Sequence, residues 1–113
     1  MIKYITIIGA YNHNMETRTT AFTIAVDNTW SNDQIMSALH DIAKEYCLTD
    51  EGKRTYDGNC CNFNIGDLTA YVPTEIFIKH DVIPQFRFIS ADTMNIDFNE
   101  QLVEESDIFP DEE

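Results

Sequence analysis

Residues 30–48 read Trp-Ser-Asn-Asp-Gln-Ile-Met-Ser-Ala-Leu-His-Asp-Ile-Ala-Lys-Glu-Tyr-Cys-Leu, and no other stretch constrains the fold as strongly. Ser31 and, three residues later, Gln34 form the pattern of a capping box at a helix start. Trp30 and Ile35 are spaced for a hydrophobic staple across that start. The spacing predicts a helix that ends near Leu48. Its apolar residues recur three and four positions apart and form one amphipathic stripe: Ile35, Ala38, Leu39, Ile42, Ala43 and Tyr46.

Two strand-like segments precede this helix. Ile2 to Tyr11 is rich in β-branched and aromatic residues, and both of its faces are mostly apolar, which is typical of a strand buried on both sides. Arg18 to Asp27 alternates as a half-buried strand does. The polar residues 12–17 between them have an ordinary loop length. The sequence therefore predicts an N-terminal β-hairpin with a loop of about six residues.

The chain after the helix carries weaker signals. Residues 49–59 are polar and are expected to form a loop. Short apolar runs that alternate at period two, as strands do, then follow at 61–65, 68–72, 76–78, 86–88 and 94–98. Segment 74–81 is interpreted as a strand, with a short helix started by Pro73 as the alternative. Together these elements predict an α+β fold, a mainly antiparallel sheet with one amphipathic helix packed on it.

The composition predicts one domain, 1–113, because 113 residues with 43% hydrophobic side chains suffice for a single core. An odd number of cysteines, two of them adjacent, does not suit a disulfide framework. The N-terminus lacks the layout of a signal peptide, and no apolar stretch approaches the roughly 18 residues of a membrane span. We therefore expect a protein of a reducing cytoplasm.

The sequence contains no motif for catalysis or cofactor binding. Glycine-rich phosphate loops, a nucleophile elbow, a zinc-protease helix and an EF-hand pattern are all missing from it. The spacing of the conceivable soft-metal ligands is not that of a zinc site, so buried thiols are the preferred interpretation. A cysteine nucleophile paired with a histidine stays an alternative. We expect a non-enzymatic protein without metal or cofactor; the ligands considered are Cys47, Cys60, Cys61, His40 and His80.

The charge is large and uneven. Seven basic and 20 acidic residues give −13, which repels phosphates and so disfavours nucleic acid and anionic membranes as partners. The last basic residue is Arg87, and the final 26 residues hold nine acids and no base. Such a block is a signature of an interaction segment that binds a basic protein surface. The alternative is a solvated, partly disordered acidic terminus.

The acidic C-terminal segment, 92–113, is the candidate binding surface, with its end expected to be disordered. Interleaved apolar residues such as Met94, Ile96, Leu102, Val103, Ile108 and Phe109 are candidates for holding it in place. Carboxylates at alternate strand positions lie about 6.6 Å apart, and DNA presents one charge per roughly 3.4 Å along each strand. An ordered acidic face therefore fits a groove lined with Lys and Arg. The predicted partner-binding residues are Asp92, Asp97, Glu100, Glu104, Glu105, Asp107 and Asp111.

In its size, its acidity and its acidic C-terminal block, the chain resembles small phage-encoded inhibitors, especially anti-CRISPR proteins and anti-restriction DNA mimics. The resemblance lies in these bulk properties and carries over no residue roles. It implies a stoichiometric inhibitor in the host-cell cytoplasm that blocks the nucleic-acid-binding groove of a CRISPR effector or another defence nuclease. The alternatives are a small acidic protein–protein interaction module or subunit and a small enzyme.

Overall fold

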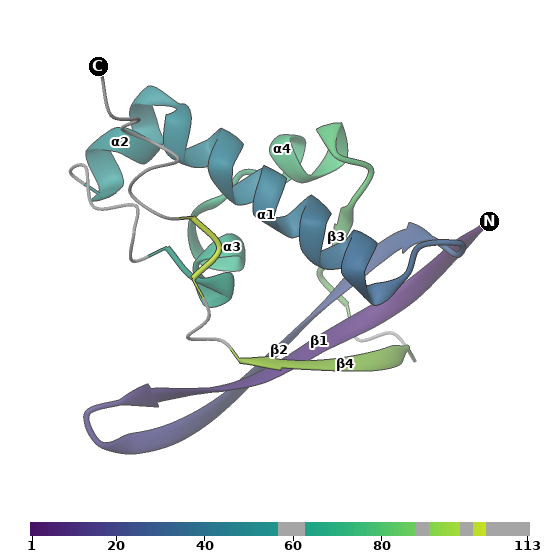
Figure 1. The fold of residues 1–113 in the computed structure, drawn as a ribbon, viewed down its shortest axis with the longest axis horizontal. Helices are drawn as coiled ribbons and strands as arrows, with labels where there is room; N and C mark the ends of the chain where they lie inside the picture. The colour runs from purple at the N-terminus through teal and green to yellow at the C-terminus, as the bar shows by residue number, and fades with distance from the viewer. Residues whose placement is uncertain (57–62, 88–90, 98–100, 104–113) are drawn as a thin grey trace.

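The computed structural model describes residues 1–56, 63–87, 91–97 and 101–103 and shows an α+β fold in them. The four described strands form one sheet in the order β3-β2-β1-β4. The four described helices lie together on one side of that sheet (Figure 1). In chain order the elements are β1 (Ile2–His13), β2 (Glu16–Asp27), α1 (Asn32–Leu48), α2 (Asp50–Tyr56), α3 (Ile65–Tyr71), α4 (Thr74–Lys79), β3 (Ile83–Gln85) and β4 (Asp92–Asp97).

β1 and β2 form the predicted hairpin, with longer strands and a shorter connection than expected. They pair antiparallel over their whole length, which leaves a turn made by Asn14 and Met15. Both turn residues have positive φ, 50° and 66°, as the central residues of a type I′ turn do. Because this turn matches the twist of the strands, pairing continues into the polar stretch 12–17 that was expected to be a loop.

Only one face of the hairpin carries the core. The register places Ile5 opposite Ile24 and Ile7 opposite Phe22, and the first three of these side chains are at most 4% exposed. On the other face, Ile2 is 55% exposed. The expectation that β1 is buried on both sides is wrong, because all the described helices lie on one side (Figure 1).

α1 agrees with its sequence pattern. Ser31 Oγ accepts from the Gln34 backbone N–H at 3.2 Å, and Gln34 Oε1 accepts from the Ser31 backbone N–H at 2.7 Å, so the capping box is confirmed. Trp30 packs against the edge of the core. The helix ends at Leu48, as expected, and the side chains that it buries are Ile35, Leu39, Ile42, Ala43, Tyr46 and Cys47.

The sheet is mixed, so the prediction of a mainly antiparallel sheet is wrong. β3 pairs antiparallel with β2, but β4 pairs parallel with β1, from Ile5 opposite Asp92 to Ala10 opposite Asp97. The alternation at Met94 and Ile96 is that of a strand, as predicted, and Met94 is buried. Period-two alternation does not encode strand direction, which depends on where the chain crosses the sheet.

The prediction of a single helix is also wrong. α2 lies in the segment expected to be a loop. α3 occupies most of the expected strand 68–72 and Ile65 of the expected strand 61–65, of which residues 61 and 62 lie outside the described residues. α4 occupies the segment interpreted as a strand, and the alternative, a short helix that starts after Pro73, is right. Short apolar runs do not separate a strand from a buried helical turn.

A second capping box explains α3. Asn64 Oδ1 accepts from the Gly66 backbone N–H at 3.0 Å, and the Asn64 backbone N–H donates to Asp67 Oδ2 at 2.9 Å. These bonds satisfy backbone groups that a helix start leaves without a helical partner. Residues 64–67 therefore carry a helix-start signal that the apolar alternation around them conceals. None of the described helices is long and apolar enough to cross a membrane.

Leu39 tests the packing of α1 on the sheet. Its side chain is fully buried in the core, so Leu39→Ala is expected to lower the free energy of unfolding by about 2–5 kcal/mol. The matched control is Leu48→Ala on the same helix, because Leu48 is 45% exposed and surface changes cost no more than about 0.5 kcal/mol. Urea titration measures both. Equal midpoints for the two variants would refute the packing.

Gly52 tests the junction of α1 and α2. Thr49 Oγ1 donates to the Tyr46 carbonyl at 2.6 Å and accepts from the Gly52 N–H at 3.0 Å. A Cβ on Gly52 would lie 2.1 Å from the Tyr46 carbonyl oxygen. Although alanine favours a helix, Gly52→Ala is expected to cost about 1–3 kcal/mol, because two backbones must move apart. Thermal unfolding measures the loss, and Lys53→Ala, an exposed change in the same turn, should leave the midpoint nearly unchanged.

Candidate functional site

The structure describes two of the seven predicted partner-binding residues. Asp92 begins β4 with an exposed side chain, and Asp97 ends the same strand. β4 is an edge of the sheet. Asp92 and Asp97 are five positions apart in the strand, which places their Cα atoms about 16 Å from each other. The other predicted residues, Glu100, Glu104, Glu105, Asp107 and Asp111, lie outside the described residues.

The described parts of the acidic segment are attached to the fold at two places. Met94 of β4 is 6% exposed and packs into the core. Leu102 and Val103 are 5% and 0% exposed, and the Leu102 backbone N–H donates to the Phe63 carbonyl at 3.0 Å. These three expected core residues are therefore confirmed. The expected anchors Ile108 and Phe109 lie outside the described residues.

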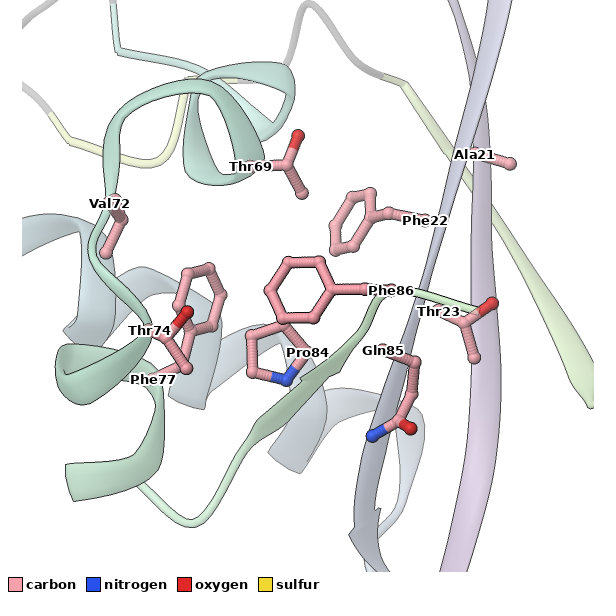
Figure 2. A pocket seen from close by; sticks show the side chains of 10 residues that line it. All are labelled: Ala21, Phe22, Thr23, Thr69, Val72, Thr74, Phe77, Pro84, Gln85 and Phe86. Atoms are coloured by element: carbon pink, nitrogen blue, oxygen red, sulfur yellow. The ribbon is translucent and has the colours of Figure 1, made fainter. Parts of the chain in front are cut away.

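A groove that the sequence did not indicate lies near the opposite edge of the sheet, where β2 meets α3, α4 and β3. It encloses about 340 Å³. Figure 2 shows Phe22, Phe77 and Pro84 facing this space, with the ring of Phe86 between them. None of the described residues that line it is charged; they are Ala21, Phe22, Thr23, Thr69, Val72, Thr74, Phe77, Pro84, Gln85 and Phe86.

Local chain reversals create the groove. After α4, Asp81 adopts a left-handed φ of 62°, and the Val82 backbone N–H bonds to the Phe77 carbonyl at 3.1 Å. This turn brings the short strand β3 beside β2, with Pro84 opposite Ile24. β3 ends at Gln85, so the next residue, Phe86, lies beyond the strand at the mouth of the groove (Figure 2).

Phe86 is 86% exposed. Burying a phenylalanine side chain gains about 1.5–3 kcal/mol, so exposure of this ring beside other apolar groups marks a surface suited to a partner. The sequence placed Phe86 in a strand that alternates with Phe88. This prediction is wrong for Phe86, because the described strand β3 is Ile83–Gln85 and Phe86 follows it; Phe88 lies outside the described residues.

Groups suited to catalysis or metal binding are dispersed in the described residues. Cys47 is fully buried on the core face of α1, so it cannot meet a substrate without opening the core. Cys60 and Cys61 lie outside the described residues. Within the described ranges, no three His, Cys, Asp or Glu side chains are grouped so that they could hold a metal ion.

The carboxyl groups of Asp67 and Glu45 have shifted pKa values, and contacts within the fold explain both shifts. Burial raises the pKa of the Asp67 carboxyl, partly offset by the hydrogen bond from Asn64 in the α3 cap. Glu45 lies between Lys79 Nζ, at 2.9 Å from its Oε2, and His80 Nε2, at 3.2 Å from its Oε1. The hydrogen bond from Lys79 lowers the pKa of the Glu45 carboxyl, with a smaller contribution from His80, while desolvation opposes both. This cluster ties α1 to the end of α4.

Comparison with protein-family models, curated proteins and solved structures gave no match to this chain. Function is therefore argued from the charge distribution and from the two surfaces at opposite edges of the sheet.

The Glu45 cluster predicts a pH dependence. Because folding lowers this pKa, the cluster stabilises the fold above the ordinary glutamate value of 4.5, and this contribution is lost as pH falls through the folded pKa. Glu45→Gln should therefore lower the urea midpoint at neutral pH and have less effect at strongly acid pH. Glu75→Gln, an exposed change on α4, is the control. A gap between Glu45→Gln and the parent that widens on acidification would contradict the assignment.

Proposed function

We propose that the protein is a non-enzymatic acidic inhibitor that binds a basic protein surface, namely the nucleic-acid-binding groove of a CRISPR effector or another defence nuclease. The observation that carries this proposal is the charge asymmetry: nine acids and no base in the final 26 residues of a chain of net charge −13. Such a chain attracts surfaces that have evolved to bind phosphates, and it is repelled by nucleic acid itself.

In such a contact, carboxylates of this protein take the place of the nucleic-acid phosphates that the basic groove otherwise binds. Hydrogen bonds from Arg and Lys to carboxylates are charge-assisted, and those from Arg are often bidentate. Asp92 supplies one exposed carboxylate on the edge strand β4. The attachment of the segment through Met94, Leu102 and Val103 supports the proposal, because an anchored segment loses less conformational entropy on binding than a free tail.

A second candidate is a small acidic interaction module or subunit that binds through apolar contacts. The uncharged groove and the 86% exposed side chain of Phe86 favour it. The two candidates differ in their response to salt: screening weakens exposed charge contacts and leaves apolar burial intact or stronger.

The test reverses four acids of the segment, Asp97, Glu100, Glu104 and Glu105, to Lys. A partner is captured from lysate, identified by mass spectrometry and purified, and its affinity for parent and variant is measured at two salt concentrations. The matched control reverses four exposed acids elsewhere, Glu16, Asp33, Asp41 and Glu75, and has the same net charge. Circular dichroism checks that both variants are folded.

The proposal expects loss of binding in the segment variant, weaker binding of the parent at high salt, and competition by nucleic acid. The control variant should keep most of its affinity. Equal loss in both variants would mean that net charge and not the segment directs binding. Undiminished binding of the segment variant, without competition by nucleic acid, would overturn the inhibitor proposal in favour of the interaction module.

A further inference from the structure

The outer edge of β2 continues past β3. Residues Arg18–Ala21 pair with β1 on one side. On the other side β3 pairs only with Thr23–Ala25, and no described strand reaches Arg18–Ala21. All four residues are exposed. Backbone groups on such an edge can pair with a strand from another chain.

The direction of these backbone groups follows from Pro84. In an antiparallel pair, opposed residues alternate between hydrogen-bonded and non-hydrogen-bonded positions. Pro84 has no N–H, so its pairing with Ile24 suits the non-hydrogen-bonded type. The residues of β2 that direct their backbone N–H and C=O outward on this side are then the odd-numbered ones, which include Thr19 and Ala21.

The groove begins where this edge meets β3. Ala21 belongs to both features, and the next residue, Phe22, lines the groove. Figure 2 shows Phe22 and Phe86 on the strand side of the space and Phe77 on the helix side. A strand beside Arg18–Ala21 would direct alternate side chains toward the helices. One such side chain would enter the groove beside Phe86.

The charge of this region differs from that of the molecule. The described residues that line the groove include no charged side chain. The charged residues along the exposed part of β2 and just after Phe86 are Glu16, Arg18 and Arg87, and Glu16 is paired with Arg18 at 3.7 Å. A neutral to slightly positive edge on a chain of −13 selects a segment without basic residues. A second copy of the chain is disfavoured because two copies of this net charge repel.

We propose that the outer edge of β2 and the adjoining groove together bind an extended apolar peptide segment of a partner protein, with uncharged flanks. The segment adds as a strand beside Arg18–Ala21 and inserts an apolar side chain into the groove beside the ring of Phe86. Its main-chain hydrogen bonds supply affinity and the groove supplies selectivity. This surface lies across the sheet from β4, so it does not depend on the acidic segment.

The probe is a phage-displayed library of random peptides about seven residues long, since such a length covers the exposed edge. It is selected on the parent protein, and the enriched peptides are synthesised and titrated against two variants. Phe86→Asp places a charge at the mouth of the groove. Ala21→Pro removes one outward N–H. The control is Met15→Asp, which makes the same apolar-to-acid change at a fully exposed turn residue whose left-handed φ suits Asp.

The expected result is enrichment of peptides with alternating apolar residues and few Lys or Arg. They should bind Phe86→Asp about tenfold or more weakly than the parent and should bind Met15→Asp as tightly as the parent. Amide exchange followed by NMR should slow at Thr19 and Ala21 on binding, a readout that does not depend on the folding of Ala21→Pro.

Several results would overturn the proposal: no enrichment, enrichment of basic peptides, equal binding to Phe86→Asp, or protection of amides in β4 in place of β2. Light scattering that finds a parent dimer and a monomeric Phe86→Asp variant would assign the surface to a second copy and not to a partner peptide. None of these results bears on the four reversed acids of the C-terminal segment, so the two proposals fail separately.

Discussion

The apolar stripe of α1 is buried in one core with the face of the β1–β2 hairpin that carries Ile5, Ile7 and Ile24. This one contact surface organises the molecule, because a hairpin alone is marginally stable and an amphipathic helix alone is no better. The capping box at Ser31 fixes where the helix begins. The type I′ turn fixes the hairpin register and so selects which face is apolar. The remaining elements pack around this pair.

The shortness of those remaining elements shapes the surface. α3 and α4 have seven and six residues, and β3 has three. Together they cover the core beside β2 only in part, which leaves the groove, the exposed ring of Phe86 and a stretch of the β2 edge that no described strand pairs with. At the opposite edge of the sheet, β4 pairs with β1 and carries the exposed side chain of Asp92.

Local signals in the sequence were sufficient to predict the hairpin and α1, since both depend on contacts between residues near in the chain. For α1 these signals are the capping box from Ser31 to Gln34 and the apolar stripe through Leu39. Local signals were insufficient for α3, because a helix of seven residues spans too few turns to show a period. The parallel pairing of β4 depends on how the chain crosses the sheet, which no local pattern records. The candidate acidic surface was visible as charge alone, whereas the groove exists only through the packing of Phe22, Phe77 and Pro84 from three separate elements.

Charge and apolar exposure are separated across the sheet. The uninterrupted acidic block includes β4 at one edge, while two of the seven basic residues, Arg18 and Arg87, lie along or just beyond the strands at the other. Long-range attraction acts over about 10 Å at ordinary salt, and apolar contacts act only when water is expelled. If the proposed function is right, a basic partner is attracted to the acidic segment before apolar contacts form. An extended apolar segment of the same partner, or of another, could then occupy the β2 side without displacing it, because the width of the sheet separates the two surfaces.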